Sequence, residues 1–144
     1  MRKRILSLAV GLLAGFAVTG LVEGLSSLLY PLPPGFDMHD MEAFRHHVAG
    51  LPVGAFLIVL AAHALGAFAG GLACARVAPA PWRAGPVIIG ALLMAAGIVN
   101  LLTIPHPAWF AAADLVAYLP MAIFGGRLGR RGAAPSPPAD PPTP

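Results

Sequence analysis

Residues 51–75, LPVGAFLIVLAAHALGAFAGGLACA, constrain the fold most strongly, because they form a long apolar run without Asp, Glu, Lys or Arg. A hydrocarbon core of about 30 Å needs about 20 helical residues, so this run is long enough to cross a bilayer as a helix. One face of that helix carries four residues at helical spacing, namely His63, Gly66, Gly70 and Cys74. This face therefore combines a GxxxG packing motif with a titratable histidine.

The composition extends this interpretation to the whole chain. The sequence is 58% hydrophobic and only 10% charged, whereas soluble domains carry about 25% charged residues. Further long apolar runs occupy residues 5–30, 86–104 and 108–126. We therefore predict an all-α fold, a four-transmembrane-helix bundle whose main partner is the lipid bilayer. Nucleic-acid binding is excluded, because the basic residues lie at segment ends and form no face.

The segments between and after these runs differ in character. Prolines at 31, 33 and 34 end the first run. Residues 37–49 predict a short amphipathic helix in the first outer loop, with Asp37 as its N-cap. Residues 1–131 then form a single membrane domain, and the Pro- and Ala-rich residues 132–144 predict a disordered cytoplasmic tail.

Basic residues are distributed unequally between the two ends of the predicted helices. Of the 9 Lys and Arg residues, all but Arg45 fall at the ends shared by the N- and C-termini. Positive charge is retained on the cytoplasmic side of membrane proteins, so both termini are predicted to be cytoplasmic.

Three local patterns resemble a known group of proteins. Glu23 precedes a YPLPPG turn, a HALGAFAGG stretch begins at His63, and Asn100 is followed closely by IPHPAWF. Together they resemble a family of small bacterial four-helix inner-membrane proteins that has no known activity. The resemblance implies a four-span layout over about residues 1–130 and a location in the bacterial inner membrane, and it brings no catalytic residues.

Each predicted membrane helix contains one strongly polar residue, and these are Glu23, His63, Asn100 and Asp114. An ionisable group at the centre of a membrane helix costs about 2.5–3.5 kcal/mol, so such groups face the bundle interior and pair. We expect the four to meet in the outer half. They would act either as a polar latch between helices or as the proton site of a small transporter that uses Glu23, His63 and Asp114.

The predicted loop helix offers a weak metal-binding hypothesis. His39, Glu42 and His46 recur at i, i+3 and i+7, which is compatible with Zn²⁺ or Cu²⁺ ligation at the outer face. No HExxH motif, nucleophile–base pair, phosphate loop or cofactor motif occurs in the sequence. The chain is therefore predicted not to be an enzyme and to need no cofactor.

Two GxxxG motifs predict how the helices pack. Gly11 and Gly15 form one, and Gly66 and Gly70 form the other. Small residues at this spacing let two backbones approach closely, so self-association through these faces is expected. The leading functional prediction is a small integral membrane protein of structural or accessory role, ahead of the transporter and the metal-binding protein.

Overall fold

The computed structural model describes residues 1–37, 39–79 and 82–131, and in these ranges it is all-helical, without strands. The predicted tail at 132–144 lies outside the described residues. The elements are α1 (Arg2–Leu29), α2 (Met41–Ala49), α3 (Val53–Val77), α4 (Ala84–Thr103) and α5 (Ala108–Arg131). All but α2 are long and apolar enough to cross a membrane.

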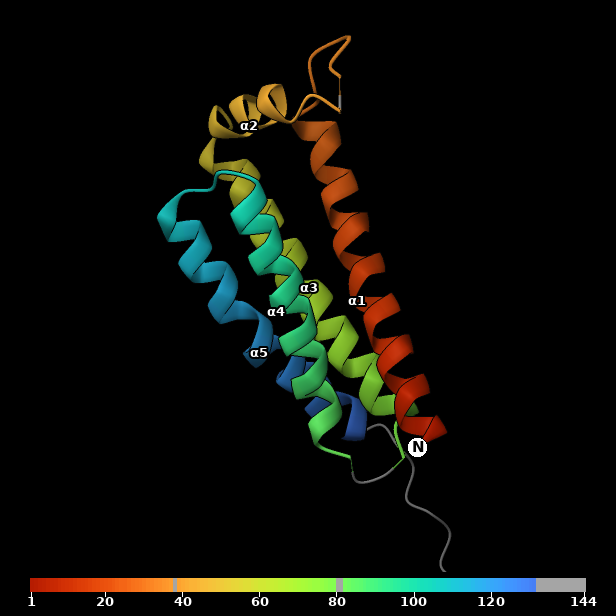
Figure 1. The fold of residues 1–144 in the computed structure, drawn as a ribbon. Helices are drawn as coiled ribbons and strands as arrows, with labels where there is room; N and C mark the ends of the chain where they lie inside the picture. The colour runs from red at the N-terminus through yellow and green to blue at the C-terminus, as the bar shows by residue number, and fades with distance from the viewer. Residues whose placement is uncertain (38, 80–81, 132–144) are drawn as a thin grey trace, which may run out of the picture.

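The long helices run beside one another, and α2 lies across one end of them (Figure 1). Helix α3 packs against α1, α4 and α5, and α4 also contacts α1 and α5. We call the end where α1 finishes and α3 begins the α2 end. The opposite end holds the N-terminus (Figure 1) and the arginines that close α3 and α5, and we call it the arginine-rich end.

Glycines set the close approach of α1 to α3. A Cβ atom added at Gly70 would lie 2.9 Å from the carbonyl oxygen of Gly11, and one added at Gly66 would lie 2.9 Å from that of Gly15. The two predicted GxxxG motifs therefore face each other in antiparallel register inside one chain. An oligomer would have to use other surfaces.

Glycines also set the crossing of α3 with α5. A Cβ atom at Gly71 would collide with the carbonyl oxygen of Ala122, and one at Gly125 would collide with that of Phe68. The last helix was predicted to end at residue 126, but α5 continues to Arg131. The glycines in this part of the sequence are packing positions and do not terminate the helix.

The other long helices also extend past the apolar runs from which they were predicted. Helix α1 begins at Arg2 rather than residue 5, and α3 includes Arg76 and ends at Val77. Helix α4 begins at Ala84, before Pro86. Arginine is a good helix former, so the helices continue beyond their apolar residues at the arginine-rich end.

The short helix α2 begins later than residues 37–49 predicted. Its N-cap is Asp40, whose side chain accepts hydrogen bonds of 3.0 Å from the backbone N–H groups of Glu42 and Ala43. The prediction of Asp37 as N-cap was wrong, because Asp37 instead accepts a 2.8 Å hydrogen bond from the backbone N–H of His39. This Asx turn holds His39 outside the helix.

Candidate functional site

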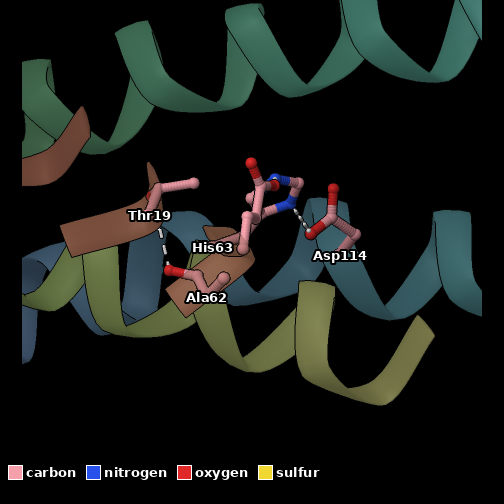
Figure 2. Close-up of polar contacts among 5 residues, drawn as sticks. Thr19, Ala62, His63 and Asp114 are labelled. Atoms are coloured by element: carbon pink, nitrogen blue, oxygen red, sulfur yellow. Dashed lines mark hydrogen bonds and ion pairs between the residues drawn. The ribbon is translucent and has the colours of Figure 1, made fainter. Parts of the chain in front are cut away.

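A histidine on α3 lies between two carboxylates from other helices. His63 Nδ1 lies 2.7 Å from Asp114 Oδ1 on α5 (Figure 2), and His63 Nε2 lies 3.3 Å from Glu23 Oε1 on α1. We call these three residues the carboxylate–histidine relay. It connects α1, α3 and α5 through three titratable side chains.

The two carboxylates of the relay differ in their access to solvent. The side chain of Asp114 is fully buried, that of His63 is 9% exposed, and that of Glu23 is 42% exposed. Within the described residues, the second carboxylate oxygen of Asp114 has no hydrogen-bond partner. The relay therefore joins a buried carboxylate, that of Asp114, to a partly exposed one, that of Glu23.

Tyr118 covers one face of the histidine. Its ring stacks on that of His63, with centroids 5.5 Å apart and an interplanar angle of 29°. A Cβ atom at Gly97 of α4 would lie 2.5 Å from the Tyr118 hydroxyl, so the glycine leaves room for the tyrosine. Tyr118 follows Asp114 by one helical turn on α5, a spacing that places the two side chains on the same face of the helix.

The register between α1 and α3 places Glu23 beside the histidine. The Thr19 hydroxyl donates a 3.4 Å hydrogen bond to the carbonyl oxygen of Ala62 (Figure 2). This contact continues the glycine register by one more turn. Glu23 follows Thr19 by one further turn on α1, where His63 is within reach.

Asn100 of α4 lies near the relay without joining it. It lines the same cavity as Glu23 and His63, but in the described structure its side chain makes no hydrogen bond to either. Of the four predicted cluster residues, three are thus in contact, and Asn100 faces the space between them and α4.

That space is a cavity of about 610 Å³, to which all five helices contribute. It extends from the level of Phe16 and Leu93 toward the α2 end. Nearer the arginine-rich end, Gly15 allows α1 to contact Leu93 of α4. A Cβ atom added at Gly15 would lie 3.1 Å from the side chain of this leucine. Toward the α2 end, Thr19, Glu23 and Ser26 of α1 line the cavity, which lies between α1 and α4. Its polar wall includes Glu23, Ser26, Ser27, His63 and Asn100.

Helix α2 covers the cavity at the α2 end. Phe44, His47 and Val48 line the cavity from this helix. Arg45 Nε donates a 2.9 Å hydrogen bond to the carbonyl oxygen of Thr103, which ties α2 to the last turn of α4. Val48 also belongs to a buried apolar cluster that continues into α3 and α5.

The structure does not assemble the weak metal site predicted from the loop. In the described part of the chain, no group of three or more His, Cys, Asp or Glu side chains is placed to hold a metal ion. His39 precedes α2, whereas Glu42 and His46 lie within it, so the three do not share one helix. Cysteine can also bind metal ions, but Cys74 is buried and forms no disulfide.

Comparisons of the chain with protein-family models, with curated proteins and with solved structures find no match. The class of protein therefore rests on the fold and the site. Over its described residues, this small protein is all-helical, and four of its helices are long and apolar enough to cross a membrane. Its distinguishing feature is a carboxylate–histidine relay at the wall of a cavity.

Proposed function

We propose that this chain is a small multi-pass protein of the bacterial inner membrane that binds a small ligand in its cavity and couples binding to protonation of the relay. It would act as a proton-coupled permease or as a binding component of one. The observation that carries the proposal is the position of Glu23, a partly exposed carboxylate in contact with His63 at the cavity wall. Intramembrane ionisable groups of this kind mark ligand and proton pathways.

The orientation follows from charge. Basic residues gather at the arginine-rich end, so we place that end in the cytoplasm and the α2 end at the periplasmic face. The cavity lies toward the α2 end. At the other end, the glycine contacts between α1 and α3 and between α3 and α5 leave little space. Access is therefore proposed from the periplasmic side.

A second candidate is the structural role in which the relay only joins helices. The buried Asp114–His63 contact supports it, because hydrogen bonds between membrane helices stabilise their association. A purely structural latch, however, has no need for a carboxylate that is 42% exposed at a cavity wall. The two candidates differ in whether water reaches the cavity.

Cysteine labelling tests this difference. Ala96 and Ala95 are adjacent exposed residues of α4, but only Ala96 lines the cavity. Each is replaced by Cys, and intact spheroplasts are treated with a membrane-impermeant maleimide. The native Cys74 is buried and provides the background. We expect Ala96→Cys to react at least about tenfold faster than Ala95→Cys, because maleimides need the thiolate form, which is favoured in water.

Equal, slow reaction of both variants would contradict the proposal. It would mean that lipid or side chains fill the cavity, and the structural role would then stand. Reaction of Ala96→Cys only after the spheroplasts are opened would reverse the proposed orientation.

A further inference from the structure

The charge of the relay can be derived from its two contacts. Each approach between a histidine nitrogen and a carboxylate oxygen is attractive only when a proton lies between the two atoms. With both contacts satisfied, the relay is either an imidazolium between two carboxylates or a neutral imidazole with one protonated carboxyl group. Either arrangement carries a single net negative charge.

No fixed positive charge of the described residues neutralises the relay from within the cavity. Neither Lys nor Arg is among the lining residues. Besides Glu23 and His63, the lining groups that titrate are Tyr30, His47, His106 and Tyr118. His106 Nδ1 lies 2.8 Å from the carbonyl oxygen of Ile104, so this nitrogen is engaged with the backbone. Arg45 points its guanidinium at Thr103 instead.

The remaining wall is mainly apolar and includes several aromatic rings. Phe16, Phe44 and Phe56 line the cavity, together with the ring of Tyr118 over His63. Aromatic faces attract cations, and desolvation strengthens that attraction. A metal ion fits poorly, because Glu23 is the one carboxylate among the lining residues and hard cations need several oxygen ligands. A cavity of about 610 Å³ falls in the range of small-molecule sites.

We propose that the cavity binds a monovalent organic cation with an apolar body, whose charge lies against Glu23 and whose body contacts the aromatic wall. This inference rests on the proposed function and specifies its ligand class. The charge of such a cation neutralises the relay, and its apolar body buries the aromatic wall. A metal ion lacks the apolar body, and an anion lacks the positive charge.

Tetraphenylphosphonium serves as the probe, and tetraphenylborate is its counterpart of similar shape and opposite charge. Binding is measured by equilibrium dialysis with the full chain in lipid nanodiscs, with empty nanodiscs subtracted. The variants are Glu23→Gln and, as the matched control, Glu42→Gln, which removes an exposed carboxylate of α2 that does not line the cavity. We expect phosphonium binding to weaken about tenfold or more in Glu23→Gln and less than about twofold in Glu42→Gln.

A second measurement avoids any change at the relay. Phosphonium should protect Ala96→Cys from the maleimide in a chain that retains Glu23, whereas borate should not. Equal binding of the two ions, or equal affinity of wild type and Glu23→Gln, would overturn the inference and indicate a purely apolar ligand such as a lipid chain. Rapid labelling of Ala96→Cys without phosphonium binding overturns this inference alone, whereas absence of labelling overturns the proposed function as well.

Discussion

Among the described residues, His63 and Asp114 form the shortest polar contact between helices, with 2.7 Å between Nδ1 and Oδ1 and no exposed surface on the aspartate side chain. The contact on the other side of the imidazole, to Glu23, is longer at 3.3 Å and open to the cavity. The relay is therefore asymmetric. Its buried half is suited to holding helices together, and its exposed half is suited to meeting a ligand.

The first prediction concerns this asymmetry. Asp114→Asn replaces the carboxyl group that contacts a buried histidine and should lower the free energy of unfolding by about 1–3 kcal/mol. Glu23→Gln changes a partly exposed group and should cost less than about 1 kcal/mol. Denaturant unfolding in mild detergent measures both. A larger loss in Glu23→Gln than in Asp114→Asn would reverse the roles assigned to the two carboxylates.

The second prediction concerns the crossing of α3 with α5. Gly71→Ala would place a methyl group against the Ala122 carbonyl oxygen, and overpacking of this kind costs about 1–3 kcal/mol. Gly24→Ala is the matched control, because nothing lies within 4 Å of a Cβ added there.

In the control, the helix propensity of alanine should stabilise the protein by about 0.5–1 kcal/mol. Melting temperatures in detergent compare the two variants with wild type. If Gly71→Ala melts at or above the temperature of Gly24→Ala, the crossing between the helices is looser than the structure indicates.

The third prediction concerns pH. A proton added to the satisfied relay removes its net negative charge, so protons and an organic cation compete. Binding of tetraphenylphosphonium should tighten as pH rises, by at most about tenfold per pH unit for one displaced proton. The other titratable groups that face the cavity are Tyr30, His47, His106 and Tyr118.

Dialysis across a pH series measures this slope in wild type and in Glu23→Gln. The variant should show a flatter dependence, because the carboxylate that competes for the proton is gone. An unchanged slope in the variant would assign the pH dependence to other groups, namely the remaining His63–Asp114 pair or His47 and His106 at the cavity wall.

The fourth prediction concerns the cover formed by α2. Arg45→Gln removes the guanidinium that donates to the Thr103 carbonyl oxygen. The loss of an exposed hydrogen bond of this kind is worth about 1 kcal/mol, which corresponds to roughly fivefold faster opening. Hydrogen–deuterium exchange of the α2 amides measures it. Glu42→Gln on the same helix is the control, and equal exchange in both variants would show that Arg45 does not hold the cover.

Much of the architecture was predictable because hydrophobicity and helical period are local properties. A long apolar run that crosses a bilayer forms a helix, because each of its backbone polar groups must find a hydrogen-bond partner within the segment. The positions of the long helices followed from this rule, apart from their ends. The last helix, for example, was predicted to end at residue 126 but continues to Arg131, because its end was set by the loss of hydrophobicity and arginine also favours helix.

The sequence by itself determined that Glu23, His63, Asn100 and Asp114 had to find polar surroundings, because isolated charges are costly in a membrane interior. Only the tertiary structure decided how they did so. The antiparallel glycine register brings Glu23 to His63, the α3–α5 crossing brings Asp114 to its other nitrogen, and the widening between α1 and α4 leaves Asn100 across a cavity. These outcomes depend on close packing between segments far apart in the chain, and no local pattern of residues encodes such distances.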